Sequence, residues 1–287
     1  MQLNQFSGVM TLTNLIKKRG LIIAIIVTLF TLLILLNVYF SNSVTVKISQ
    51  LNVRSGPGVN YSLKGTVKRG THLQVTDKKN NWLKVVANHK QTGWVASWLV
   101  DKTTIGHHSK LAETTIVLDP GHGGDDTGAL SNTQKYEKKY TLQIAKRVAQ
   151  QLRSQGAKVI LTRSTDKTAS LVSRPALAEK VHADAFISFH LDSSDVANSA
   201  SGVTSYYYHD GASKRLATNI NNQLRSLPLP NRGVQFGDFL VIRNNTVPAV
   251  LLETGYINSN SNFKRIKSIK YQNQIAQDVV TGLNNYF

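Results

Sequence analysis

The order of apolar and polar positions divides the chain into three parts that predict three kinds of structure. Leu21–Phe40 is apolar throughout and carries no charge, and a helix of that length rises about 30 Å, the thickness of a membrane's hydrocarbon layer. Val44–Lys102 has short apolar runs rich in valine and aromatic residues, separated by turn signals. From Glu113 onward, apolar runs alternate with segments of helical periodicity. The pattern predicts a membrane helix, a small β domain and an α/β domain, in that order.

The α/β part is expected to contain a mostly parallel, twisted sheet with helices on both faces. Its strands are predicted at TIVLD, KVILTR, DAFISFH, GVTSYYYH and AVLLETG, and the alternation in GVTSYYYH is typical of an edge strand. Helices are predicted over Glu137–Gln155, Lys214–Leu227 and Tyr271–Tyr286, and over SLVSRPALAEKVHA after an early interruption by Pro175. Strand–helix alternation indicates this fold because parallel strands need crossover connections, which are usually helical.

The β part predicts a small all-β barrel over residues 43–103. Its stretch LNVRSGPGVNY, with GWV near the end, resembles the bacterial SH3-like domains of cell-wall proteins. Such domains bind wall peptides in some proteins and only space or dock other domains in others, so the ligand stays open. Trp82, Trp94 and Trp98 either form a recognition surface or belong to the barrel core. Residues 104–112 follow as a polar linker, in which the adjacent pair His107–His108 is taken as solvated and receives no role.

The membrane segment predicts that everything after it lies outside the cell. The basic run Lys17–Arg19 stands immediately before the apolar segment, and the residues just after Phe40 are uncharged. By the positive-inside rule, residues 1–20 form a cytoplasmic tail and 21–40 a single-pass anchor in the cell membrane. A cleaved signal peptide is the alternative, but its apolar core is usually shorter and is followed by small residues that SNSVTV does not supply.

Charge and composition limit the binding partners and the kinds of metal site that are expected. The chain carries a formal charge of +18 and has no cysteine. Disulfides and thiolate metal sites are therefore excluded, and a metal site would use His, Asp or Glu. The positive charge favours polyanionic partners. Because the folded part is expected outside the cell, nucleic acid is not an expected partner, whereas outer-leaflet lipid and anionic wall polymers are.

Four imidazole or carboxylate side chains are expected to meet at one edge of the α/β sheet. His122 follows the strand TIVLD within the turn PGHGG, while DAFISFH ends on His190 and AVLLE ends on Glu253. Sites in such sheets lie outside the carboxyl ends of the strands. Glu137 begins the helix after the first strand, and a helix in that position starts at the same edge. The predicted fold therefore brings the four groups together.

Two imidazoles and two carboxylates at one place favour a catalytic zinc site. Such a site uses three protein ligands and keeps one position for water, whose pKa falls to about 7. A further carboxylate can take the proton from that water and return it to the leaving nitrogen. The spacing does not decide which glutamate binds the metal. Asp119 is expected either to orient the His122 ring or its loop or, as the favoured interpretation, to cap the turn.

The ordered set LDPGHGG, Glu137, SFHLD and LLETGYINS resembles the zinc-dependent N-acetylmuramoyl-L-alanine amidases of bacterial cell walls. The resemblance covers residues 113–287, and the anchor and SH3-like domain before it are similar to those of membrane-anchored members. It implies that His122, Glu137 and His190 hold the zinc and that Glu253 is the catalytic acid/base. It also implies the substrate, peptidoglycan, and the bond cleaved, between the lactyl group of N-acetylmuramic acid and L-alanine of the stem peptide.

Two arginines and one missing segment add further expectations. Arg163 and Arg232 are expected either to contact carboxylates of the muropeptide or to form structural ion pairs. Regulated members of the family carry a long insertion after the second zinc histidine, which forms a helix that plugs the site. Here LDSSDVANSASGVTSYYY runs directly into the next strand. Control by a membrane-protein activator, through the anchor or the SH3-like domain, is therefore the hypothesis.

Other functions are compatible with parts of the sequence. A zinc-dependent deacetylase hydrolyses an amide with the same chemistry, and a zinc peptidase does so too, although the HExxH pair is absent. A non-catalytic wall-binding scaffold belongs to a different class. The complete set of four site residues argues against the scaffold, because a degenerate site is expected to have lost one.

Overall fold

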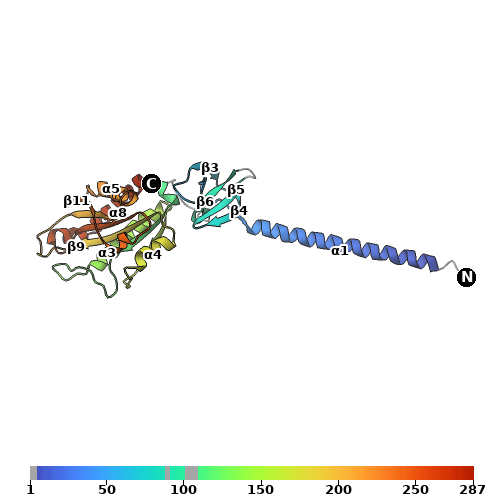
Figure 1. Ribbon diagram of the computed structural model, residues 1–287, viewed down its shortest axis with the longest axis horizontal. Coiled ribbons are helices and arrows are strands. Elements are labelled where there is room, and N and C mark those ends of the chain that lie inside the picture. Colours follow the sequence, from blue (N-terminus) through green and yellow to red (C-terminus); the bar gives the residue numbers. More distant parts are fainter. Residues whose placement is uncertain (1–4, 88–90, 101–108) are drawn as a thin grey trace.

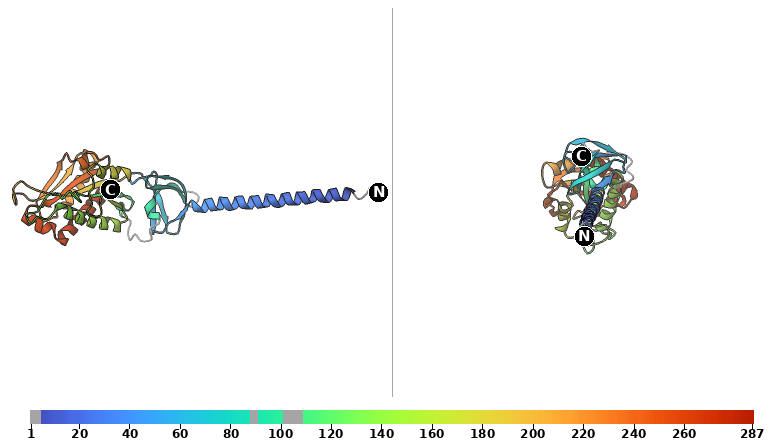
Figure 2. Two further views of the ribbon diagram at one scale, coloured as in Figure 1. Left: turned by 90° about the horizontal axis from the view of Figure 1, so that it is seen from below. Right: turned by 90° about the vertical axis from the view of Figure 1, so that its right-hand side faces the viewer.

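The computed structural model describes residues 5–87, 91–100 and 109–287. Within these ranges the chain forms a long N-terminal helix, α1 (Gln5–Ser41), then a six-stranded β domain, then an α/β domain on a second six-stranded sheet. The β domain lies between the helix and the α/β domain along the long axis of the molecule (Figures 1 and 2). This is the predicted fold class. Most of the predicted linker, including His107–His108, lies outside the described residues.

Helix α1 begins well before the predicted anchor. Its segment Leu15–Asn37 is long and apolar enough to cross a membrane, and none of it is buried against the rest of the described chain. A helix that is apolar on all sides and has no protein to pack against is typical of a membrane anchor or of a signal sequence.

The β domain is closed around a small apolar core. Alternate residues such as Leu51, Val53 and Val85 are fully buried. Trp82 belongs to this core, and Trp94 and Trp98 pack against it, so the tryptophans serve packing rather than a free recognition surface. The antiparallel strands lie in the order β1-β4-β5-β6-β2-β3. They are β1 (Ser43–Thr45), β2 (Gln50–Arg54), β3 (Leu63–Lys68), β4 (His72–Lys79), β5 (Trp82–Ala87) and β6 (Gln91–Ala96), followed by helix α2 (Ser97–Val100).

The second sheet has the order β11-β10-β12-β9-β7-β8. Every neighbouring pair is parallel except β10 and β12. The strands are β7 (Thr115–Pro120), β8 (Lys158–Leu161), β9 (Ala185–Asp192), β10 (Val203–Tyr207), β11 (Asn231–Phe236) and β12 (Ala249–Tyr256). The helices are η1 (Lys110–Glu113), α3 (Glu137–Ser154), α4 (Ser173–Lys180), α5 (Ala212–Leu224), α6 (Leu240–Arg243), α7 (Asn260–Ile266) and α8 (Ile269–Tyr286).

The edge strand differs from the prediction. GVTSYYYH forms β10, but β10 lies between β12 and β11 rather than at the edge of the sheet. The edge is β11, whose sequence NRGVQF is polar and largely exposed. An edge strand with no buried face has no reason to alternate apolar and polar residues, so periodicity could not find it.

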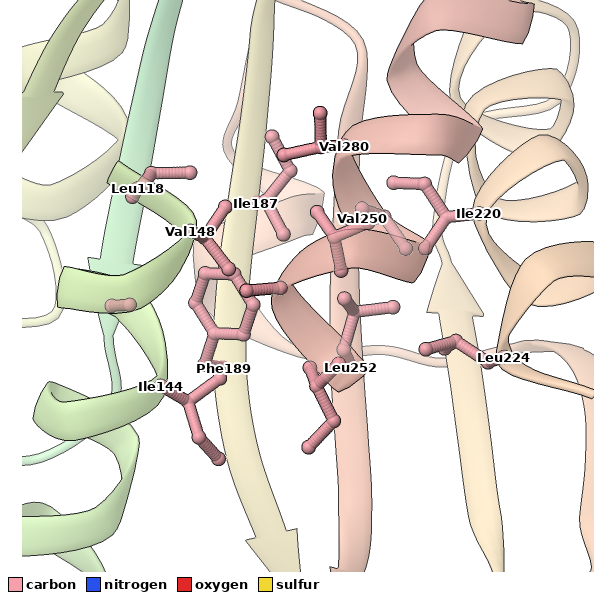
Figure 3. Packing of buried hydrophobic residues seen from close by; sticks show 14 of the residues in the cluster. Leu118, Ile144, Val148, Ile187, Phe189, Ile220, Leu224, Val250, Leu252 and Val280 are labelled. Atoms are coloured by element: carbon pink, nitrogen blue, oxygen red, sulfur yellow. The ribbon is translucent and has the colours of Figure 1, made fainter. Parts of the chain in front are cut away.

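The two faces of this sheet are covered unequally. Helices α3, α5 and α8 pack on one face around a large core that includes Ile144, Phe189 and Leu252 (Figure 3). On the opposite face the described contacts come from the short helices α4 and α6, which pack on a smaller core around Phe186 and Leu251. In the strand register, Glu253 lies beside His190 and, like Leu251, on this second face.

The β domain is attached at the opposite end of the sheet. Asn81 donates to the carbonyl of Val181, just after α4, at 2.8 Å. Glu113 accepts from Arg54 Nε at 2.9 Å and from Asn52. Trp98 donates its indole N–H to the carbonyl of Ala112 at 3.0 Å. These contacts hold the β domain near the amino ends of the strands.

Candidate metal centre and catalytic site

Three of the predicted site residues point their polar atoms at one position. His122 Nε2 lies 3.1 Å from a carboxylate oxygen of Glu137, and His190 Nδ1 lies 3.2 Å from the other oxygen. The two histidine nitrogens are themselves 3.2 Å apart. The residues come from the loop after β7, the first turn of α3 and the end of β9. Among the described residues, they form the one group of three or more with ligand atoms close enough to share a metal ion.

The spacing and the types of these atoms fit a divalent metal. A tetrahedral zinc with ligand bonds of 2.0–2.1 Å would place neighbouring ligand atoms about 3.3 Å apart. The two histidine nitrogens are 3.2 Å apart, which is close to that value, and each lies 3.1–3.2 Å from a different oxygen of Glu137. One ligand atom from each of the three residues lies within 4.8 Å of the others. Two imidazoles and one carboxylate are also a donor set that suits zinc, and three ligands leave room for a fourth.

Glycines let the ligands approach one another. A Cβ on Gly121 would lie 2.3 Å from the His190 ring, and a Cβ on Gly128 would lie 2.6 Å from Glu137 Oε2. His122 itself has φ +61°, which is uncommon for a residue with a side chain. Such a conformation persists only where the surroundings fix it, and it turns the imidazole towards the other two ligands.

The buried carboxylate of Glu137 is held by the backbone as well as by the histidines. It accepts from the N–H groups of Ala129 at 2.9 Å and Leu191 at 2.8 Å. Burial acts to raise its pKa, but hydrogen bonds from His122 and His190 outweigh burial and lower it. Glu137 therefore stays ionised, as a metal ligand must.

Asp126 orients the His122 ring, a role that the sequence had offered to Asp119. Its two carboxylate oxygens each lie 2.9 Å from His122 Nδ1. That contact leaves Nε2 facing Glu137 and fixes the ring, as partners of metal-binding histidines usually do. Asp126 stands four residues after His122 in the loop, and the sequence pattern had given it no role.

Asp119 is fully buried and does not contact the His122 ring or cap the turn. It accepts from Thr162 at 2.6 Å, from Ser188 at 2.7 Å and from Arg174 at 2.7 Å. Arg174 in turn donates to the carbonyl of His122 at 2.9 Å. Asp119 therefore supports the loop through Arg174, a residue that the sequence analysis did not single out.

Arg163 is not placed to contact substrate. Its side chain is buried, and its guanidinium donates to the carbonyls of Pro120, Gly121 and Lys138 at 2.8–3.0 Å. Together with Arg174 it binds three successive carbonyls of the Pro120–His122 loop. An arginine at a strand end can either bind substrate or support the backbone. The sequence could not show that the N–H groups of Arg163 already donate to backbone carbonyls.

Glu253 faces the same region but stays apart from the three ligands. Its Oε2 is buried with no hydrogen-bond partner. Burial raises the pKa of this carboxyl well above its usual value, and the negative charges of Glu137 and Asp192 add to the effect. A carboxyl that is easily protonated and has a free oxygen suits proton transfer rather than structural support.

Arg232 is exposed. Its guanidinium lies over the Tyr256 ring, 5.7 Å from the ring centroid. Burial is the main cause that raises the pKa of the Tyr206 hydroxyl, and the negative charges of Asp192 and Glu253 add to it. The positive charge of Arg232 acts in the opposite direction, but the net shift of this pKa is upward. Arg232 therefore lies close to Tyr206 and Tyr256 and, unlike Arg163, is exposed.

The chain connecting β9 to β10 forms no helix. Residues 193–202 are described throughout and contain turns and irregular backbone. A plug of the kind expected in regulated relatives is therefore not formed by this segment.

Two protein families match the chain. Residues 116–285 match the family described as N-acetylmuramoyl-L-alanine amidase, and residues 49–101 match the bacterial SH3 domain. A relative with the same extent is the probable cell wall amidase LytH of Staphylococcus aureus, which is 36% identical over 282 residues and 94% of each chain.

Solved structures agree with this assignment. The N-acetylmuramoyl-L-alanine amidase of Clostridium difficile 630 is 36% identical, with a TM-score of 0.59 over 60% of this chain and 96% of that one. The CwlD amidase of Clostridioides difficile, in complex with the GerS lipoprotein, is 29% identical, with a TM-score of 0.58 over 60% of this chain and 98% of that one.

Proposed function

This chain belongs to the N-acetylmuramoyl-L-alanine amidase family and is a cell-wall hydrolase, and from that premise we propose that its catalysis uses zinc held by His122, Glu137 and His190, with Glu253 as acid/base. The bond it cleaves joins N-acetylmuramic acid to L-alanine of the peptidoglycan stem peptide. The observation that supports the site most directly is the convergence of the three ligand atoms beside the free Oε2 of Glu253.

The chain's own residues would divide the work in the following way. When bound, zinc would lower the pKa of a water and polarise the scissile carbonyl. In its ionised form Glu253 accepts the proton of the attacking water. Because burial raises its pKa, Glu253 holds that proton until it donates it to the departing alanine nitrogen. The Arg163–Arg174 contacts with the Pro120–His122 carbonyls keep His122 in its strained conformation.

The experiment is direct. The full chain, purified in detergent, is incubated with peptidoglycan with and without a chelator, and the products are identified by mass spectrometry. Stem peptide beginning with L-alanine is expected, with activity lost on chelation and restored best by zinc. Release of acetate, cleavage inside the peptide, or undiminished activity of metal-free protein would contradict the proposal.

Arg232 is proposed to bind a carboxylate of the stem peptide. Its exposed guanidinium has no carboxylate partner among the described ion pairs, and it lies on the rim of the site over Tyr256. Arg232→Gln is expected to raise KM for stems with a free carboxylate and to leave KM for amidated stems unchanged. An equal change for both stems would assign Arg232 a structural role instead.

We also propose that α1 remains as a membrane anchor with the amidase domain outside the cell. Alkaline extraction should leave the chain in the membrane fraction, and external protease should digest the domain in intact cells. A shortened, freely released chain would instead identify α1 as a cleaved signal.

An activating membrane protein is proposed as well, since the segment 193–202 forms no plug. A soluble chain lacking α1 that matched the activity of the enzyme in membranes would contradict that part.

The β domain is proposed to contact anionic wall polymers. Between Ser43 and Val100 the sequence has one acidic residue, Asp77, and nine basic ones. Lys47, Lys68 and Lys78 are exposed on it. Binding to a polyol-phosphate polymer should therefore weaken steeply with salt. Binding that is independent of salt would point to another ligand.

A further inference from the structure

Two pairs of aromatic rings, each with one exposed phenylalanine and one half-buried tyrosine, lie at strand β10 and its neighbours, next to β12, the strand of the proposed acid/base. Tyr206 and Phe239 pack edge to face with centroids 5.1 Å apart, and Tyr208 and Phe236 pack at 5.3 Å. Phe236 is 60% exposed and Phe239 39% exposed. These four rings are here called the aromatic ridge. Exposed apolar groups gathered in one place usually mark a binding surface.

The ridge leads towards Glu253. Thr204, two residues before Tyr206 on β10, pairs in register with Glu253, and Tyr206 pairs with Leu251. Thr204 and Tyr206 therefore lie on the same face of the sheet as Glu253, about 7 Å apart along the strand. Thr204 is buried there, and the half-buried ring of Tyr206 packs against the smaller core.

The backbone under the ridge is fitted to the rings. Gly237 separates the two phenylalanines, and a Cβ there would lie 2.6 Å from the Phe239 ring and 2.8 Å from the Tyr206 ring. Its N–H donates to the carbonyl of Tyr207 at 2.9 Å. The ion pair between Asp238 and Arg243, at 2.7 Å, fastens the same segment. The rings are thus held in place although they are exposed.

Charged side chains beside the ridge form two ion pairs. Asp238 pairs with Arg243, and Asp210 pairs with Lys214 at 3.2 Å. Paired charges suit an uncharged polymer better than an anionic one, and Arg232, which has no acidic partner among the described ion pairs, is left to bind a carboxylate. Flat aromatic faces carry partial negative charge and attract the C–H groups of a pyranose ring, while the flanking polar side chains can bind its hydroxyls.

We propose that the aromatic ridge binds the uncharged glycan strand of peptidoglycan, with the sugar that bears the scissile bond next to Tyr206 and Phe239. The proposal rests on the function proposed above. The lactyl group puts the muramic sugar a few bonds from the scissile amide, so a glycan bound on one side of Glu253 must occupy the adjoining surface. The stem peptide then leaves towards Arg232.

The test compares a polymeric with a minimal substrate. Full-length Phe236→Ala and Phe239→Ala are expected to raise KM about five- to ten-fold on glycan strands that carry stems, with kcat unchanged. KM for a soluble muramyl peptide with a single sugar is expected to change less for Phe236→Ala, since its ring lies farther along the ridge. Ile269→Ala, which removes an equally exposed side chain at the start of α8, is the control and should change neither.

Inhibitors separate glycan from peptide. Peptide-free glycan should inhibit the wild type and lose potency against Phe236→Ala, while free stem peptide should inhibit both equally. Phe236→Leu keeps apolar bulk but no flat ring and should behave like Phe236→Ala. Equal KM changes of Phe236→Ala on both substrates, loss of peptide inhibition alone, or full recovery by leucine would overturn the proposal. A wild type that releases no L-alanine-terminated peptide from either substrate would instead overturn the function on which it rests.

Discussion

At the scale of single residues, the structure gives a contact partner to each of the two ring nitrogens of His122. Nε2 faces Glu137, and Nδ1 faces both oxygens of Asp126. The aspartate thereby fixes the ring's tautomer and direction. His122 also has a strained backbone, so its placement depends on such neighbours.

Asp126→Asn should weaken metal binding without unfolding the protein. The expected loss of zinc affinity is about 10- to 100-fold, because the amide holds the ring less firmly and makes it a poorer ligand. Competition with a chromophoric chelator measures it. The adjacent Asp125→Asn removes an exposed carboxylate that does not contact His122 and should bind zinc as the wild type does.

Glu253→Gln should stop turnover and leave the metal in place. The amide cannot transfer the proton, so kcat should fall about 10²- to 10⁴-fold. Zinc content, measured by elemental analysis, should be unchanged because Glu253 is not one of the three converging ligands. Loss of zinc would make Glu253 a ligand, and retained turnover would remove its assigned role.

Sequence could predict the four site residues because each stands at a strand end or at a helix start. It could not predict how hydrogen-bond donors are distributed. Arg163 and Arg232 look alike in sequence, yet one is buried against carbonyls and the other is exposed. Asp126, for which no role was expected, contacts the His122 ring in the way considered for Asp119, because positions a few residues apart in a tight loop point in different directions.

At the scale of elements, the amino end of the central strands contains an acid that opposes folding at neutral pH. Asp184, just before β9, accepts from the N–H of Thr115 at 2.7 Å. Burial raises its pKa from 3.8 to about 6, although that hydrogen bond acts in the opposite direction. The folded state therefore binds this proton more tightly than the unfolded state does.

Asp184→Asn should stabilise the protein above pH 6. The pKa rise makes the ionised acid cost at most about 3 kcal/mol of unfolding free energy, and the cost develops as pH rises from about 4 to about 6. Asparagine can still accept from Thr115, so the melting temperature at pH 8 should rise by several degrees. The gain should shrink towards zero near pH 4. An equal gain at both pH values would mean that ionisation is not its cause.

The elements themselves were predictable to different degrees. Long helices such as α3 and α8 and the buried strands β7, β9 and β12 have strong periodicity or continuous apolar runs. The edge strand β11 and the short helix α6 do not, since neither buries a regular face. The aromatic ridge lies between these two weakly patterned elements, which is why only the structure brings it into view.

At the scale of the whole molecule, a buried ion pair couples the two domains. Arg54 of β2 binds Glu113 just before β7, and the Glu113 side chain is 4% exposed. The RSGPG motif that suggested a ligand-binding module thus contributes its arginine to the contact between the domains. Sequence predicted both domains but not this use, because the pairing joins residues far apart in the chain.

Glu113→Ala should uncouple the domains. Removing one partner leaves the guanidinium without its charge partner at the interface, which typically costs about 3–5 kcal/mol. We expect calorimetry of the folded chain in detergent to show two transitions for this variant and one for the wild type. Asp195→Ala, which removes an exposed carboxylate, should melt as the wild type does. A single transition in both would show that the ion pair does not couple the domains.

The sheet has its β domain and helix α1 at one end and the metal centre at the other, separated by strands such as β9 that are about 26 Å long. With α1 retained in the membrane, as proposed, the metal site would stay at a constant distance from the lipid surface while the enzyme diffuses laterally. Glycan lying directly on the bilayer would then be too close to the membrane to be cut, and the outer layers of the wall too far from it. Inserting a rigid spacer ahead of Ser43 should raise the plane of trimming by the length of the spacer.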